Sequence, residues 1–378
     1  MPCFGQWVLF LSSAAGLWLA SCNGKEPQQF SLDRIPRGQW IKIPTLGEAA
    51  PKVFHGGAAI SASRGEVYFF GSDTHALTAL ENGESNSLWR LNLRTLTWSR
   101  DYEQDPKSAW RILPDSQTVT TAGRPWAMHT FDAVEYDPVA HRVVVVSYPQ
   151  HARFEPEERF PMFKGEWYKS LKPSHWEYDP DSRSWVLLAT AGAPDLFAKA
   201  LTWDSDRKLL LAVDGNRTWH FDRETGRWID ENASGTPSGW HLSMVYDTFD
   251  KCALLLGHNG GSDTLYAYSA PEKKWSAIPA TGRPLPANGA AMAYDTRNCV
   301  LLYLANDYPD QYNNPTGKSV TFIYHSGRKT WERLEVQSPE LYGMNYLMQY
   351  DRAHNIFLHF EKSLETGDYL QVWAFRYK

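Results

Sequence analysis

The sequence lacks long basic runs and the common catalytic motifs. Its 38 Lys and Arg are set against 43 Asp and Glu, and the net charge of −5 offers no positive patch for a phosphate backbone, which excludes nucleic acid as an expected partner. No nucleophile elbow, HExxH helix, phosphate loop or dinucleotide fingerprint is present. The 12 His are scattered without a close pair at metal-ligand spacing, so we expect neither a metal nor another cofactor.

Aromatic residues, by contrast, are abundant. The chain has 17 Trp, 19 Tyr and 17 Phe among 378 residues, with 43% hydrophobic and 21% charged residues, a balance that excludes a disordered chain and a polytopic membrane protein. Trp and Tyr are frequent in strands, and the 26 Gly and 23 Pro are spread along the chain as turn formers. The composition therefore predicts an all-β protein built from many short strands.

The N-terminus predicts export and a lipid anchor. Residues 1–24 carry no charged side chain, and the apolar stretch 7–20 is too short for a secure membrane span, which is typical of a signal peptide. It ends in the letters LASC, which resemble the lipobox of bacterial lipoproteins, in which the cysteine is acylated. The resemblance implies a signal peptide over 1–21, a lipid on Cys22, a tether over 22–37 and a place in the bacterial cell envelope, with membrane contact only through the lipid. An ordinary cleaved signal and a retained anchor are the alternatives.

One sequence pattern recurs along the rest of the chain. It consists of an apolar strand ending in an aromatic residue and Asp, a polar turn, a hydrophobic strand, a loop, and an aromatic strand followed by a turn and Trp, as in ALTWDSDRKLLLAV followed by RTWHFDRETGRW. The closing tryptophans are Trp40, Trp98, Trp185, Trp228, Trp275 and Trp331. Their shorter intervals, 43 and 47 residues, match four-stranded propeller blades, so we expect six blades. The strand of Trp40 has no beginning of its own, and we expect it to close the ring by pairing with the strand of Trp373.

The pattern resembles the Kelch family of β-propellers over about residues 38–378, through the recurring Tyr-Asp turn and the Trp of the outer strand. The paired glycines of that family are mostly replaced here, for example by Asp214-Gly215. The resemblance implies a six-bladed Kelch-like β-propeller over 38–378 with four-stranded blades. We expect it to be a monomer.

Loop lengths distinguish two faces of the expected ring. The turns between the first and second strands and between the third and fourth strands are short, and we call their side the short-turn face and expect it to be structural. The opposite side, the long-loop face, carries the long insertions 72–87, 100–124, 148–174 and 305–318. Long loops on a rigid scaffold commonly bind partners, so we expect a carbohydrate or protein to dock there, between blades 1 and 2.

Polar and aromatic residues precede each innermost strand at the long-loop mouth of the channel. Aligned on the Tyr-Asp turn, with His55 and His129 taken as equivalent, the candidate ligand-binding residues are His55, His129, Lys199, Trp240, His241, Asn288, Asn345 and Tyr346. Hydrogen-bonding groups beside an aromatic ring suit a carbohydrate. A structural role in a polar, hydrated channel is the alternative.

These observations lead to a non-catalytic, surface-tethered propeller that binds a carbohydrate or protein, with no catalytic residue assigned. The runner-up is a sugar-ring isomerase, because bacterial sialic-acid mutarotases are secreted Kelch-like propellers that use polar channel groups as acids and bases. A structural envelope component is a third interpretation. Copper-radical oxidases on related propellers need a Tyr–Cys pair at the mouth, whereas Cys252 and Cys299 lie after the short turns. We expect these two cysteines to be buried free thiols, with a disulfide between them as the alternative.

Overall fold

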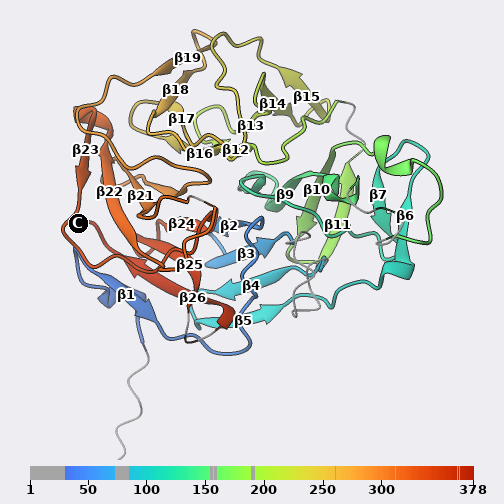
Figure 1. The fold of residues 1–378 in the computed structure, drawn as a ribbon, viewed down its shortest axis with the longest axis horizontal. Helices are drawn as coiled ribbons and strands as arrows, with labels where there is room; N and C mark the ends of the chain where they lie inside the picture. Colours follow the sequence, from blue (N-terminus) through green and yellow to red (C-terminus); the bar gives the residue numbers. More distant parts are fainter. Residues whose placement is uncertain are drawn as a thin grey trace, which may run out of the picture.

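The computed structural model describes residues 30–378 except 73–84, 154–155, 157–159, 189–191, 260, 311, 364 and 366. The expected signal peptide and Cys22 therefore lie outside the described residues. The chain forms an all-β propeller of six four-stranded antiparallel blades around one axis, with inner strands such as β2, β12, β16 and β24 near the centre (Figure 1). Neighbouring innermost strands contact each other around the whole ring.

Blades 1 to 5 run from an innermost strand to an outermost one in chain order, and in blade 6 the outermost strand is β1. The strands of blades 1 to 3 are β2 (Gly57–Ser61), β3 (Glu66–Phe70), β4 (Trp89–Asn92) and β5 (Thr97–Arg100); β8 (Val134–Asp137), β9 (Arg142–Ser147), β10 (Ser174–Asp179) and β11 (Ser184–Leu188); β12 (Ala200–Asp204), β13 (Leu209–Val213), β14 (Thr218–Asp222) and β15 (Arg227–Asp230). Those of blades 4 to 6 are β16 (Ser243–Asp247), β17 (Cys252–Leu256), β18 (Tyr266–Ser269) and β19 (Lys274–Ala277); β20 (Ala291–Asp295), β21 (Val300–Asn306), β22 (Ser319–His325) and β23 (Thr330–Arg333); β24 (Met348–Asp351), β25 (Ile356–Ser363), β26 (Gly367–Phe375) and β1 (Trp40–Ile43).

The ring closes as the sequence predicts. Strand β1 from the start of the fold pairs with β26 from its end, with Lys42 opposite Trp373, and the two lie side by side in Figure 1. Residues 30–37, assigned to the tether from the sequence, include the 3-10 turn η1 (Leu32–Arg34). Leu32 and Ile35 there are buried in a core shared by blades 1 and 6, so the packed part of the chain starts before the Trp40 strand.

The recurring Tyr-Asp pair is explained by contacts between blades. The last residue of each innermost strand from blade 2 onward is an aspartate, the turn aspartate, and all five are buried: Asp137, Asp204, Asp247, Asp295 and Asp351. One oxygen of Asp247 accepts the N–H groups of Phe249 and Asp250 at 2.8 and 3.1 Å and so holds its own turn. The same oxygen accepts the hydroxyl of Tyr294 from the next blade. Burial raises the pKa of Tyr246, and the charge of Asp204, the turn aspartate of blade 3, adds to the shift. The Tyr350 hydroxyl, by contrast, donates to Asn355 of its own blade at 2.7 Å.

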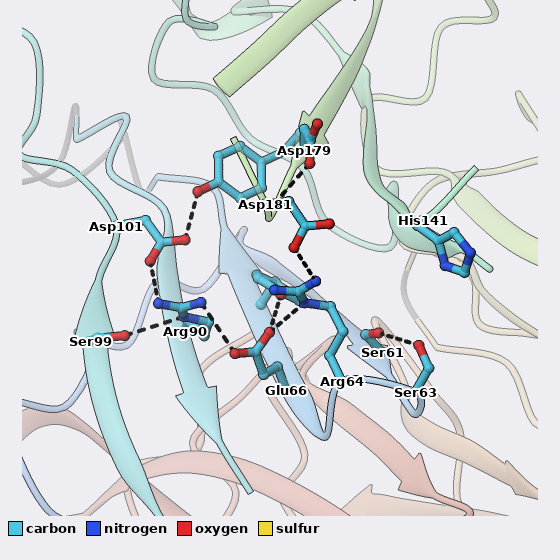
Figure 2. Close-up of polar contacts among 12 residues, drawn as sticks. Ser61, Ser63, Arg64, Glu66, Arg90, Ser99, Asp101, His141, Asp179 and Asp181 are labelled. Carbon is cyan, nitrogen blue, oxygen red and sulfur yellow. Dashed lines mark hydrogen bonds and ion pairs between the residues drawn. The ribbon is translucent and has the colours of Figure 1, made fainter. Parts of the chain in front are cut away.

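The junction of blades 1 and 2 is built differently. Blade 1 has Ser61 in place of a turn aspartate, and the Tyr136 hydroxyl of blade 2 is buried without a hydrogen-bond partner among the described residues. An ionic network joins these blades instead (Figure 2). Arg64 of blade 1 pairs with Asp181 of blade 2 at 2.6 Å, and Asp101, which pairs with Arg90 at 3.1 Å, accepts the hydroxyl of Tyr178. Glu66 lies between the two arginines and pairs with Arg64 at 2.9 Å and with Arg90 at 3.2 Å, so every charged group of the network has a partner of opposite sign.

We expect Tyr294→Phe to lower the free energy of unfolding by about 1–2 kcal/mol. The substitution removes the buried hydrogen bond from the Tyr294 hydroxyl to the Asp247 carboxylate, which then loses one of its donors. Tyr136→Phe is the matched control, since the hydroxyl that it removes has no partner among the described residues, and we expect it to be neutral within about 0.5 kcal/mol. Urea unfolding of both variants measures the difference. Equal losses in the two variants would contradict the role of the Tyr-Asp pair between blades.

The long insertions of blades 1 and 2 pack against each other. The link 100–124 forms η2 (Lys107–Ala109) and a hairpin of β6 (Trp110–Ile112) and β7 (Thr118–Thr120), and the insertion 148–174 forms η3 (Gln150–Arg153) and η4 (Trp167–Lys169). Trp110, Trp126 and Phe160 are buried together in one aromatic cluster, with the rings of Trp110 and Trp126 4.8 Å apart. The remaining turn, η5 (Ser326–Arg328), joins β22 to β23.

Cys252 and Cys299 are free thiols, as expected, and no disulfide joins them, but they are half-buried where the sequence predicted buried side chains. Burial raises the pKa of Cys252 to about 12, and it also raises the pKa of Cys299. Neither thiol is therefore activated as a nucleophile at neutral pH.

Candidate functional site

The centre of the ring holds a cavity of about 490 Å³, which we call the channel cavity. Asp132, Ala290 and Tyr346 line its inner end, where the innermost strands begin. Its outer end is formed by residues of the turns that follow these strands: Ser63, Pro138, His141, Ser205, Thr248, Thr296 and Arg352. The cavity therefore opens on the short-turn face, to which the sequence analysis gave a structural role only.

Aromatic side chains line the middle of the channel cavity. The residue before each turn aspartate is aromatic, and these five are Tyr136, Trp203, Tyr246, Tyr294 and Tyr350. Because this position repeats in blades 2 to 6, the pattern that joins the blades also surrounds the cavity with rings. Methionines of three neighbouring strands complete the apolar wall, and they are Met244, Met292 and Met348.

Two carboxyl groups of blade 2, those of Asp132 and Glu135, stand out in this wall. One oxygen of Asp132 accepts the backbone N–H of Met244 in blade 4 at 2.8 Å. The two oxygens of Glu135 accept the backbone N–H groups of Tyr136 at 2.7 Å and Trp203 at 3.1 Å. Rigid strands of three blades therefore fix the positions of both carboxyl groups.

Burial raises the pKa of both carboxyl groups because the charged form loses its hydration. The pKa of Glu135 rises to about 7, although two backbone N–H groups oppose the shift. The pKa of Asp132 rises well above its ordinary value, and the charge of Glu135 adds to the effect of burial. Among the described residues, no Lys, Arg or His forms an ion pair with either group. The channel cavity thus contains an acid that titrates near neutral pH.

A hydrophobic plug separates the channel cavity from the long-loop face. It consists of Phe131, Ala198, Met344 and Tyr346, all buried. The Phe131 ring lies 4.9 Å from that of His55 in blade 1 and 5.7 Å from that of Tyr346 in blade 6, so it sits at the centre of the ring. The Phe131 N–H is bonded to the carbonyl of His55 at 2.8 Å.

A side-chain hydrogen bond, 3.0 Å long, between the Tyr346 hydroxyl and His241 Nδ1 also joins the plug to the long-loop mouth. Gly289 at φ +75° lies against this hydroxyl, and a Cβ there would be 2.5 Å from it. Glycine is therefore required at this position for the contact. Burial lowers the pKa of His241 to about 4, so its imidazole is neutral at neutral pH.

The strand registers correct one alignment made from the sequence. Ser61 pairs with Glu66 and Asp137 with Arg142, which makes Phe131, and not His129, the equivalent of His55. His129 lies two residues earlier. The structure nevertheless brings the two histidines together, because their rings stack with centroids 4.3 Å apart, and His151 stacks on His129 at 5.3 Å.

The other predicted residues fall into separate environments. Lys199 donates to the carbonyl of Gly239 and lies 5.7 Å from the ring of Trp240, which is 49% exposed, and burial lowers the pKa of Lys199 to about 8. The Asn288 amide is buried, and neither of its polar atoms has a partner among the described residues. Asn345 donates to Glu361 at 3.1 Å and accepts from the Leu347 N–H at 2.7 Å, which are structural contacts.

Of the eight predicted residues, Tyr346 lines the channel cavity, and the sequence analysis missed Asp132 and Glu135. The sequence does distinguish both residues when equivalent positions of the six blades are compared. Five positions before the end of the innermost strand the other blades have Gly56, Lys199, Leu242, Ala290 and Tyr346. Two positions before it they have Ala59, Thr202, Val245, Ala293 and Gln349. Blade 2 is thus the one blade with a carboxyl group at either position.

Comparison with known proteins bears on the fold. No protein-family model and no curated protein sequence matches the chain. A solved structural genomics protein of unknown function from Bacteroides thetaiotaomicron VPI-5482 is similar with a TM-score of 0.51 and 9% identity, over 90% of this chain and 73% of that one. The structure of YjhT is similar with a TM-score of 0.53 and 11% identity, over 87% of this chain and 95% of that one. At such identities the likeness shows the fold alone.

Two kinds of feature are absent from the described residues. These residues contain no helix with the length and apolar character needed to cross a membrane. They also contain no group of three His, Cys, Asp or Glu side chains placed to hold a metal ion. The lipid anchor and the Kelch relationship stay predictions.

Proposed function

We propose that the protein is a binding protein that takes a small carbohydrate into the channel cavity from the short-turn face. The observation that carries this proposal is the cavity itself, because its volume of about 490 Å³ falls within the range of roughly 300–1,000 Å³ of small-molecule sites. Aromatic walls with a few fixed polar groups suit a sugar, whose ring stacks while its hydroxyls form hydrogen bonds. Docking of a protein on the long-loop face stays the alternative.

Ser205→Trp tests the proposal by narrowing the entrance. Ser205 is exposed in the turn after β12 and lines the outer end of the cavity, so an indole there should weaken sugar binding about tenfold or more without disturbing the core. Ser182→Trp, in an exposed turn of blade 2 outside the cavity lining, is the matched control. Saturation-transfer NMR with a panel of free sugars measures both variants. Equal binding by the two would place the site elsewhere, and the long-loop face would then be examined.

A sugar-ring isomerase is the second candidate, and one observation favours it. A general acid or base works best with a pKa near the working pH, and the pKa of Glu135 is about 7. The same NMR samples report the exchange between sugar anomers. Faster exchange that is lost in Glu135→Gln would favour the isomerase, whereas binding without faster exchange leaves a binding protein.

A further inference from the structure

We propose that the natural ligand of the channel cavity is an amino sugar, whose ammonium group binds between Asp132 and Glu135 while its ring lies among the aromatic side chains. This inference rests on the proposed function and adds the charge of the ligand to it. It follows from three features of the channel cavity: the balance of charge, the fixed positions of the carboxyl groups, and the chemistry of the wall.

The inner part of the channel cavity contains acidic side chains but no basic one among the described residues. Its ionisable lining groups are Asp132, Glu135, Tyr136, His141, Tyr246, Tyr294, Tyr346, Tyr350 and Arg352. The two basic groups, His141 and Arg352, belong to exposed turns at the outer end. The two acids deeper in the cavity are half-buried and form no ion pair among the described residues, and a carboxylate that is partly shielded from water is costly unless it is paired. A ligand with one positive charge would supply the missing partner.

The carboxyl groups are placed to receive that partner. Backbone N–H groups of Tyr136, Trp203 and Met244 hold them at 2.7, 3.1 and 2.8 Å, so little side-chain entropy is lost when a ligand binds. Each carboxylate oxygen has two lone pairs, and the single bonds to backbone leave further acceptor sites for an ammonium group, which has three donors. Preorganised acceptors of this kind form short, strong bonds with a charged donor.

The wall favours the same ligand. Trp203, Tyr246 and Tyr350 are half-buried in the lining, and a cation over an aromatic face gains electrostatic energy in a site that is partly shielded from water. The apolar face of a sugar ring stacks on the same side chains. An amine on a hydroxylated ring therefore uses the acids and the aromatic wall together, which a neutral sugar or an acidic sugar does not.

Isothermal titration calorimetry of the whole protein at pH 7 tests the inference. The probes are glucosamine, galactosamine and mannosamine, each beside its neutral N-acetyl form and the parent sugar. We expect at least one amine to bind about tenfold or more tightly than both neutral counterparts, with release of a proton to the buffer as a carboxyl group ionises. Titrations in two buffers with different ionisation enthalpies measure that proton.

Asp132→Asn and Glu135→Gln keep the shape of the cavity and remove one carboxylate each. Either variant is expected to lose the preference for the amine about tenfold while it keeps its affinity for the neutral sugar, and near-UV circular dichroism checks that each is folded. Glu335→Gln, whose side chain is 90% exposed, is the matched control. Neutral sugars that bind as well as the amines would overturn the amino-sugar inference and leave the proposed function standing. Binding that Ser205→Trp does not weaken, or no sugar binding at all, would overturn both.

Discussion

Replacement of Trp40 by alanine is expected to lower the free energy of unfolding by about 3–5 kcal/mol, the usual cost of removing a buried indole. Trp40 lies in β1, the strand that closes the ring, and is 7% exposed. Its ring packs against Phe375 of β26 at 5.1 Å, and its Nε1 donates to Thr321 of blade 5 at 2.9 Å. The substitution would leave a cavity and remove the indole hydrogen bond to Thr321, whose hydroxyl would keep its contact with Ser338 at 2.8 Å.

Trp240→Ala provides the matched control for this prediction. Trp240 is 49% exposed at the long-loop mouth, so its removal should change the free energy of unfolding by less than about 1 kcal/mol. Denaturant unfolding followed by circular dichroism compares the two variants. If both lost the same stability, the ring closure would not depend on Trp40.

The second large effect concerns pH. Burial raises the pKa of Glu135 to about 7 from 4.5, so the folded state holds this proton more tightly than the unfolded state does. The stability that comes from this group is complete below about pH 4.5 and is lost as the pH rises through 7. A shift of this size corresponds to about 3 kcal/mol, and we expect about 2 kcal/mol because water enters the cavity. Between pH 5 and pH 9 the wild type should therefore lose about 2 kcal/mol of stability relative to Glu135→Gln, which has no carboxyl group at this position.

Unfolding curves of the wild type and Glu135→Gln at several pH values between 5 and 9 measure this effect, because every other titrating group is common to both proteins. Glu335→Gln removes an exposed carboxylate and should give a curve parallel to that of the wild type. A Glu135→Gln curve that is also parallel would show that the carboxyl group is well hydrated in the folded state. The amine-binding role of the cavity would then lose its electrostatic support.

Repetition made the fold predictable from the sequence. Six copies in phase indicate six blades, and the unpaired strand of Trp40 indicates where the ring closes, because a propeller cannot leave one blade short of a strand. The Tyr-Asp pair was visible as a pattern, but its cause was not. Tyr294 and Asp247 belong to different blades, and their contact appears when the blades are packed side by side.

The candidate site was harder to predict because it depends on departures from the repeat. Loop length pointed to the long-loop face, but Phe131 fills the channel on that side, and a single aromatic residue before a strand gives no such signal. Blade 1 lacks the Tyr-Asp pair on which the copies were aligned, so His129 was matched with His55 although the two positions differ by two residues. Asp132 and Glu135 were the more informative positions, since the other five blades have a neutral or basic residue at the place equivalent to each.

The pairing of β1 with β26 also determines the order of events during synthesis. Strand β1 leaves the ribosome first among the strands, yet its partner is the last one made, so more than 320 residues must be translated before the two can meet. Until then the nascent chain carries an unpaired strand edge, which is a template for association with other chains. Contacts so distant in sequence also fold slowly. The same closure that protects the finished ring therefore makes the growing chain dependent on whatever shields it during translation.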